Sequence, residues 1–158
     1  MENIIEINDK IIIMEILNKA FLTVAQQYNF TKENAPTFPA FIRHDKIDDF
    51  LKGIKMYGYK LNDKIIGCAG YSYNKDHIYF IKRLATLPEY RHLGVGKKLL
   101  EFIENEIKNL GGKKIEIHVI DKNIVLREWY KKLNYIEIKI DENKTLPFNS
   151  CTMIKEII

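Results

Sequence analysis

The chain has 158 residues, of which 46% are apolar and 29% charged, and its 25 Lys and Arg against 21 Asp and Glu give a net charge of +4. A chain of this length and composition can bury a hydrophobic core, so neither disorder nor a disulfide-stabilised scaffold is expected. The positive charge is spread along the sequence without an arginine-rich arm, so it permits a polyanionic ligand, and we expect no nucleic-acid partner. No apolar run approaches the roughly 20 residues of a membrane-spanning helix, and we expect no membrane association.

The start of the chain and its cysteines bear on the compartment. Glu2 and Glu6 stand where a secretory signal would carry positive charge, so we expect a cytoplasmic protein. Cys68 and Cys151 each lie in an apolar run, without Cys-x-x-Cys or Cys-x-x-His spacing. We therefore predict that both are core residues and that the protein holds no metal.

Hydrophobic periodicity predicts the secondary structure in chain order. Apolar residues at helical spacing predict a helix over 10–28, which Asn8 or Asp9 can cap. Residues 29–44 form a loop too long for a simple connection, and it carries three phenylalanines: Phe30, Phe38 and Phe41. The rest is predicted as a short helix at 45–54, strands at 56–61 and 64–73 joined by an Asn-Asp turn, a strand at 78–87, a helix at 94–110, a strand at 115–120, a helix at 123–133 and strands at 135–140 and 150–157.

Two of these segments carry further information. The run at 78–87 is apolar on both faces, which is typical of a strand in the middle of a sheet. Gly111 is predicted to end the helix at 94–110 with a positive φ. No internal repeat is visible, so we predict a single α/β domain over residues 1–158.

The most informative stretch lies between the strand at 78–87 and the following helix. The strand ends at Pro88, and Gly94 and Gly96 lie where the helix begins. Glycine lets a ligand approach the backbone closely, and the first-turn amides of a helix have no partner within it. With the helix dipole they form an anion site, to which nearby basic residues add charge: Arg91, His92, Lys97 and Lys98.

Glycines at this position have three other possible interpretations. They can simply start a helix whose basic residues are solvated. A Walker A loop is excluded because no Gly-Lys-Ser/Thr follows, and a dinucleotide fingerprint is excluded because the third glycine is missing and position 99 is Leu.

At this point the sequence resembles the GNAT superfamily of acetyl-CoA-dependent N-acetyltransferases. Arg91-x-x-Gly94-x-Gly96 is similar to its pyrophosphate-binding motif, and Leu84-Ala85-Thr86 occupies the strand that usually reads Leu-Ala-Val. Downstream, Asn123 and the segment from Tyr130 to Tyr135 are similar to its Asn … Tyr-x-Lys-Leu-Gly-Phe segment, with Asn134 in place of the glycine. Asparagine is the next-best residue for a left-handed helix cap.

The resemblance implies a fold and a set of binding residues. The fold is a mixed α/β (α+β), mostly antiparallel sheet of about six to seven strands flanked by about four helices, splayed at the strand that ends in Thr86. The co-substrate is acetyl-CoA. Its binding residues are Leu84, Ala85, Thr86, Arg91, His92, Leu93, Gly94, Val95, Gly96, Lys97, Asn123 and Tyr130.

The resemblance also implies roles. The segment Arg91 to Lys97 holds the pyrophosphate, and the backbone of Leu84 to Thr86 pairs with the pantetheine arm. A bulge, common in this strand of the family, can aim an amide at the thioester oxygen. Tyr130 matches the tyrosine that protonates the leaving sulfur. Ordinary pKa values of about 10 for a phenol and about 8.5 for a thiol make it chiefly a hydrogen-bond donor, unless it is only a core tyrosine.

The general base and the acceptor are less defined. His118 lies five residues before Asn123, where some ribosomal-protein acetyltransferases carry a catalytic glutamate, and an imidazole suits proton transfer from an amine. Direct transfer to water stays open, as do four other bases: Glu33, His44, Asp45 and Glu116.

We expect a small-molecule primary amine, bound by a monomer or homodimer between residues 29–44 and the Leu146-Pro147-Phe148 segment. An acetyltransferase acting on a protein N-terminus or lysine is one alternative. A non-catalytic acyl-CoA-binding module is another.

Overall fold

The structure is a computed structural model that describes residues 3–158, so Met1 and Glu2 of the predicted domain lie outside the described residues. Its elements are β1 (Ile4–Glu6), α1 (Lys10–Tyr28), α2 (Ile47–Leu51), β2 (Lys55–Leu61), β3 (Lys64–Lys75), β4 (Ile78–Thr86), α3 (Val95–Asn109), β5 (Lys114–Ile120), α4 (Ile124–Lys132), β6 (Ile136–Asp141) and β7 (Ser150–Glu156). Short 3₁₀ helices lie at Pro39–Phe41, His44–Lys46 and Pro88–Tyr90. Within residues 3–158, no helix has both the length and the apolar character needed to cross a membrane.

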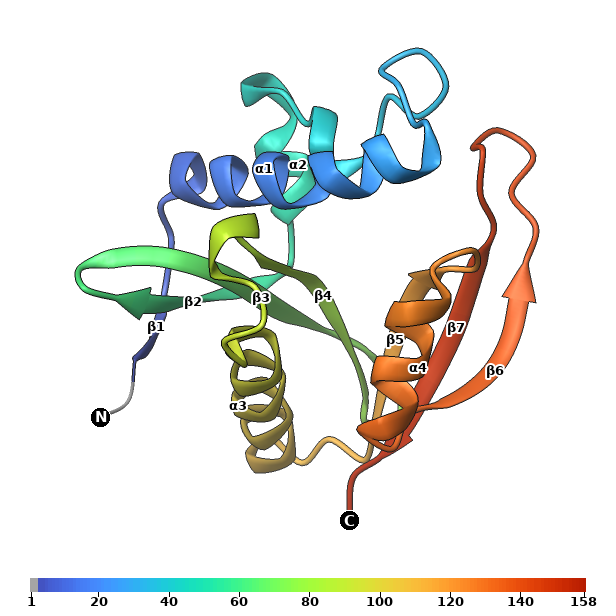
Figure 1. The fold of residues 1–158 in the computed structure, drawn as a ribbon. Coiled ribbons are helices and arrows are strands. Elements are labelled where there is room, and N and C mark those ends of the chain that lie inside the picture. The colour runs from blue at the N-terminus through green and yellow to red at the C-terminus, as the bar shows by residue number, and fades with distance from the viewer. Residues whose placement is uncertain (1–2) are drawn as a thin grey trace.

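The strands form one sheet in the order β1-β2-β3-β4-β5-β7-β6, so β4 lies in its middle, as its apolar faces predict. Among the described strands, β4 and β5 are parallel and the other neighbours are antiparallel. In Figure 1, α1 and α2 lie above β2 to β4, α3 lies below them, and α4 lies beside the half made of β5, β7 and β6. The predicted mixed, mostly antiparallel sheet with four helices is confirmed.

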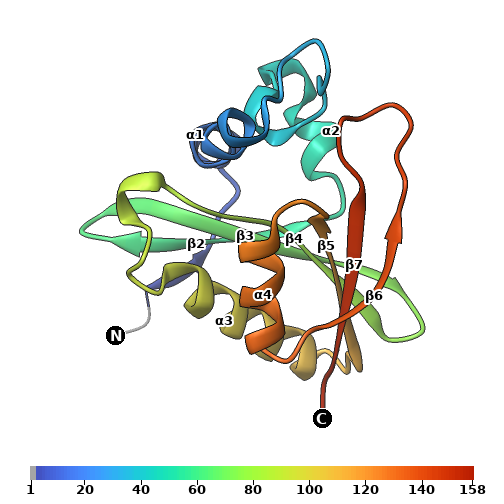
Figure 2. The same cartoon turned by 45° about the vertical axis from the view of Figure 1, so that its right-hand side comes forward.

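The sheet divides between β4 and β5. The two strands pair only where Ile78–Phe80 meets Lys114–Glu116, at one end of each strand. Beyond Phe80 they diverge, and both views show the opening between them (Figures 1 and 2). The edge of β4 from Ile81 to Thr86 therefore has no neighbouring strand on the β5 side, which confirms the predicted splay.

Both faces of the sheet are covered by amphipathic helices. The Asp9 carboxylate caps α1 by accepting the amides of Ile11 and Ile12 at 3.1 and 3.2 Å. Below the sheet, α3 buries one apolar face and ends before Gly111, whose φ of 87° is the predicted left-handed stop. Cys68 and Cys151 are fully buried, as predicted.

Two local predictions were wrong. The short strand β1 was not predicted, because three residues carry no measurable period and their strand geometry comes from pairing with β2. The short helix expected from Asp45 to Ile54 is a 3₁₀ turn followed by α2, which ends at Leu51. The chain turns there through Gly53, whose φ is 75°.

Residues 29–44 are held by an aromatic cluster, which we define as Phe30, Phe38 and Phe148. The ring of Phe30 lies 5.1 Å from that of Phe38 and 5.0 Å from that of Phe148. The loop is also bonded to α1, because the Asn18 side-chain amide donates to the Pro39 carbonyl at 2.9 Å. The long loop and the segment around Phe148 therefore meet, and their aromatic rings pack mainly on one another.

We expect Phe38→Ala to destabilise the fold by about 3 kcal/mol, because a buried phenylalanine is replaced by a cavity. Phe38 is only 5% exposed, whereas Phe41 is half-buried and lines a cavity. Chemical denaturation of both variants measures the effect, with Phe41→Ala as the matched control that loses less. Equal losses in the two variants would contradict the structural role of the aromatic cluster.

Candidate functional site

A cavity of about 500 Å³, here called the first cavity, opens at the N-terminus of α3 between β4 and α4. The binding residues implied by the resemblance line it except Leu93, which is 59% exposed. Lys98, also expected to add charge at the anion site, lies elsewhere, with its Nζ 5.8 Å from the centre of the Tyr59 ring. The segments from Leu84 to Lys97 and from Asn123 to Tyr130, which the sequence could connect only through the resemblance, thus surround one cavity. The side chain of Leu93 takes no part in that lining.

The loop before α3 presents backbone donors to the first cavity. The first intrahelical bond runs from the Lys98 amide to the Gly94 carbonyl at 3.1 Å, so the amides from Gly94 to Lys97 precede it. Gly94 has a φ of 79° and is followed by helical Val95, an alternation of hand that turns successive amides toward one concave side. Together with the helix dipole, this arrangement fits a pyrophosphate.

The guanidinium of Arg91 has a structural partner that the sequence did not indicate. It donates to the Thr23 hydroxyl at 2.9 Å and to the Ala20 carbonyl at 2.8 Å, both on α1. Arg91 therefore fixes the loop before α3 against α1. Lys97, by contrast, remains more than half exposed at the first cavity. Its positive charge still lies next to the loop amides.

Gly96 gives a direct test of whether the first cavity fits a ligand. A Cβ atom at this position would meet Thr86 and Trp129 at 3.9 Å, which is ordinary van der Waals contact. The fold itself does not need glycine here, but the added atom would enter the groove between β4 and α4. A ligand passing through that groove accounts for the missing side chain.

We expect Gly96→Leu to weaken acetyl-CoA binding at least about tenfold, or about 1.4 kcal/mol, because the side chain fills the groove. Gly96→Ala is the matched control: it should raise stability by at most about 1 kcal/mol through helix propensity and bind more tightly than the leucine variant. Isothermal titration calorimetry measures the dissociation constant. A leucine variant that is folded and binds like the wild type would refute the assignment.

The central strand β4 carries the expected bulge. From Lys82 to Ala85 the chain advances three residues, while its partner β3 advances only two, from Gly70 to Cys68. The extra residue is accommodated at Arg83, whose φ is 60°. The bulge re-aims the backbone of β4 beside the opening toward β5.

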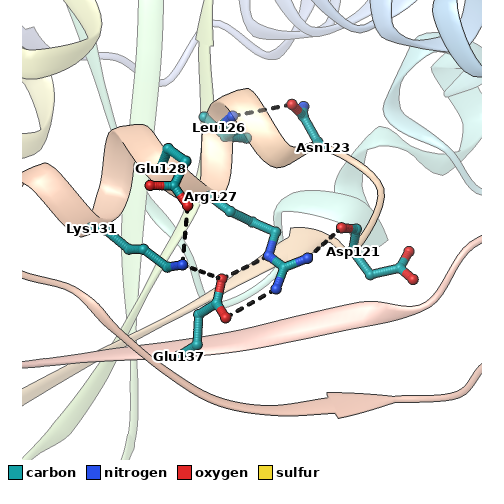
Figure 3. A network of polar contacts seen from close by, with 7 residues as sticks. All are labelled: Asp121, Asn123, Leu126, Arg127, Glu128, Lys131 and Glu137. Atoms are coloured by element: carbon teal, nitrogen blue, oxygen red, sulfur yellow. Dashed lines mark hydrogen bonds and ion pairs between the residues drawn. The ribbon is translucent and has the colours of Figure 1, made fainter.

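Helix α4 is fixed by a polar network (Figure 3). The Arg127 guanidinium donates to both oxygens of Glu137 on β6 at 2.7 and 3.0 Å, and to the Asp121 carbonyl at 2.8 Å. These bonds lower the pKa of Glu137 and raise that of Arg127. The Asn123 side chain caps the helix by accepting the Leu126 amide at 3.2 Å, so its carbonyl oxygen is used locally.

Tyr130 is the buried residue of α4 and faces the cavities. Its ring lies 4.9 Å from Trp129 and 5.4 Å from Tyr135. Burial, with a contribution from the Glu104 carboxylate, raises the pKa of Tyr130 above the ordinary phenol value. The hydroxyl therefore keeps its proton at neutral pH and is available as a hydrogen-bond donor.

A second cavity, of about 330 Å³, lies in the opening between β4 and β5. It is lined by His118 and by the two cations of the bulge, Lys82 and Arg83. Its wall is shared with the first cavity through six residues: Phe21, Val24, Leu84, Asn123, Leu126 and Tyr130. The two cavities therefore meet at Tyr130.

The candidate bases separate in the structure. His118 Nε2 lies 2.8 Å from a Glu116 oxygen, and its Nδ1 lies 3.3 Å from the Thr152 hydroxyl. Because a carboxylate accepts, Nε2 donates to Glu116 and Nδ1 accepts from Thr152. Two candidates thus form one hydrogen-bonded unit. The other three do not line any of the cavities between residues 3 and 158 described here: Glu33, His44 and Asp45.

Lys82 and Arg83 were missed in the sequence. They interrupt the apolar run from Ile78 to Leu87, and this pair of charges in a central strand was the available signal. In the part of the chain that the structure describes, no group of three or more His, Cys, Asp or Glu side chains is arranged to hold a metal ion.

The sequence model of the acetyltransferase (GNAT) family matches residues 13–135. No curated protein matches the sequence. The structure is similar to the ribosomal-protein-S18-alanine N-acetyltransferase from Escherichia coli, with a TM-score of 0.76 and 18% identity over 99% of this chain and 94% of that chain.

Two further solved structures contain ligands. The PaiA N-acetyltransferase from Thermoplasma acidophilum, in complex with coenzyme A, has a TM-score of 0.72 and 18% identity over 98% of both chains. A GNAT family acetyltransferase from Elizabethkingia anophelis, with acetyl-CoA bound, has a TM-score of 0.65 and 20% identity over 73% of this chain and 84% of that chain. At these identities the likeness shows a shared fold.

Proposed function

Because the chain belongs to the acetyltransferase (GNAT) family, we propose that it transfers the acetyl group of acetyl-CoA to a primary amine of a small molecule by direct attack in a ternary complex. One observation carries this proposal: a groove with free helix-start amides meets a second cavity at Tyr130. Structural neighbours that hold acetyl-CoA and coenzyme A support the choice of co-substrate.

The chain's own groups bind the co-substrate in an extended form. The amides from Gly94 to Lys97 donate hydrogen bonds to the negatively charged pyrophosphate. The unpaired edge of β4 from Ile81 to Thr86 pairs with the pantetheine arm as an added strand would. The thioester supplies an activated acetyl group, and an amide of the bulge stabilises the charge that develops on its oxygen.

The amine enters from the second cavity and must lose a proton as it attacks. His118 lies in that cavity, and Glu116 orients its imidazole through the 2.8 Å bond. The imidazole accepts the proton at Nδ1 once Thr152 gives up its bond, and Glu116 stabilises the resulting positive charge. Tyr130 donates a hydrogen bond to the departing sulfur.

A small acceptor is favoured over a protein terminus by the aromatic cluster. The E. coli structural neighbour is named as acting on an alanine of ribosomal protein S18. In this chain, Phe38 and Phe148 line the second cavity and contact one another, with ring centres 6.1 Å apart. The second cavity is about 330 Å³, a volume that suits a small molecule.

Tyr130→Phe should lower kcat on the order of 100-fold, because one hydrogen bond to the leaving sulfur is lost. Acetyl-CoA binding should be unchanged, since the phenyl ring keeps its packing. The assay is thiol release from acetyl-CoA across amino acids, polyamines, aminosugars and peptide N-termini. Tyr135→Phe is the matched control: its hydroxyl bonds Glu104 at 2.6 Å, so it should lose stability and keep kcat.

Three outcomes of the panel count against the proposal. If the wild type binds acetyl-CoA but none of the amines in the panel causes thiol release, the chain is a non-catalytic binding module. If only peptide N-termini or lysines react, the acceptor is a protein. A Tyr130→Phe variant with wild-type kcat removes Tyr130 from the chemistry.

His118→Gln should lower kcat roughly 100-fold, because the amide can hold the bonds of the imidazole but cannot accept the proton. The fold and the acetyl-CoA dissociation constant should not change. His44→Gln, the same substitution outside the cavities, serves as the control. Steady-state kinetics at saturating amine decides, and a full wild-type kcat in His118→Gln would leave the proton to water.

A further inference from the structure

Arg83 occupies an unusual position in the fold. It is the bulge residue of β4, with a φ of 60°, so its side chain leaves the regular alternation of the strand. The guanidinium stacks 3.6 Å from the centre of the Phe50 ring and donates to the Phe50 carbonyl at 3.1 Å. A non-glycine residue held in this conformation costs free energy, and such positions cluster at functional sites.

The charge of Arg83 is not neutralised by the chain. Its Nε atom is buried without a hydrogen-bond partner, and within residues 3–158 no carboxylate lies at ion-pair distance from it. Burial lowers the pKa of the guanidinium to about 10. The neighbouring Lys82 also has a lowered pKa, from burial first and from Arg83 second. A half-buried pair of cations without a counterion is unfavourable until an anion arrives.

Arg83 also connects two spaces. A third cavity, of about 950 Å³, is lined in part by residues 36–46. Arg83 lines both this cavity and the second cavity. The other charged residues that line the third cavity are three cations and one acid: Lys32, Arg43, Lys46 and Asp49. Its lining is therefore positively charged, and Arg83 lies on the side toward His118 and Tyr130.

We propose that the acceptor carries an anionic group, a carboxylate or a phosphate, that binds Arg83 while its amine points into the second cavity. This inference rests on the proposed acetyl transfer and specifies its substrate class. The guanidinium is already oriented by Phe50, so little side-chain freedom is lost on binding. The anion completes an ion pair that the fold leaves open, and it places the amine beside the His118–Glu116 unit.

The test uses pairs of acceptors that share one amine and differ in the anion. An amino acid is compared with its carboxamide, and an aminoalkyl phosphate is compared with the aminoalcohol. We expect kcat/KM to be about tenfold to hundredfold higher for the anionic member of at least one pair, since a hydrogen bond to a charged group is gained. The pair that shows the preference tells whether a carboxylate or a phosphate is bound.

Arg83→Gln should abolish this preference: the ratio of kcat/KM between the anionic and the neutral member of the pair should fall to about one, because the anionic member loses its partner. The matched control is Arg43→Gln: Arg43 is exposed and already paired with Asp45 at 3.0 Å, and we assign it no role in binding. The control should keep the preference, which separates recognition by Arg83 from general attraction by positive charge. Thermal unfolding of both variants checks that the fold is intact.

The outcomes separate this inference from the proposed function. Transfer to neutral amines as fast as to anionic ones, or an equal loss for both members in Arg83→Gln, overturns the inference and leaves acetyl transfer standing. If no amine is acetylated, the proposed function fails, and ligand-induced stabilisation decides the inference on its own. Anionic amines must then raise the Tm of the wild type but not of Arg83→Gln, and the absence of this difference overturns the inference.

Discussion

The short pairing between β4 and β5 is the constraint on which the site depends. After Phe80 the two strands part, because β5 continues its full register with β7 while the bulge at Arg83 bends β4. Backbone groups on the open edge of β4 then lack a strand partner, and such groups require water or an extended ligand. The opening creates both the second cavity and an unpaired edge of β4 to which an extended ligand can bind.

The surrounding elements hold that opening in shape. On one side, Arg91 connects the loop before α3 to α1. On the other side, the bidentate pair of Arg127 and Glu137 connects α4 to β6. Tyr135 adds a link to Glu104 on α3. Tyr130 lies between these anchors, on the wall that the two cavities share. Rigid supporting contacts of this kind are what a positioned proton donor needs.

Charge is distributed unevenly along this path. Lys97 and the free amides of α3 lie at the first cavity, while Lys82 and Arg83 line the second cavity. The modest net charge of +4 does not reveal this, because exposed ion pairs elsewhere cancel much of the local charge. A cation without a carboxylate partner in a cavity, such as Arg83 among the described residues, is therefore more informative about ligands than the overall charge balance.

Features that depend on local geometry could be predicted from the sequence. The period of residues 10–28, the glycine that starts α3 and the left-handed Asn134, with a φ of 72°, follow from the preferences of single residues and their near neighbours. The residues from Arg91 to Gly96 that line the first cavity could be predicted because their motif is contiguous in the sequence.

Which distant groups meet depends on how the elements pack in three dimensions. The partners of Arg91 on α1 lie about 70 residues away, β1 forms only by pairing with β2, and the position of the β4 bulge depends on its register with β3. The link between His118 and Glu116 and the unpaired charge of Arg83 depend on rotamers and on the residues packed around them. Side-chain type and spacing encode local conformation, but packing across the sheet determines which polar atoms find a partner and which remain free for a ligand.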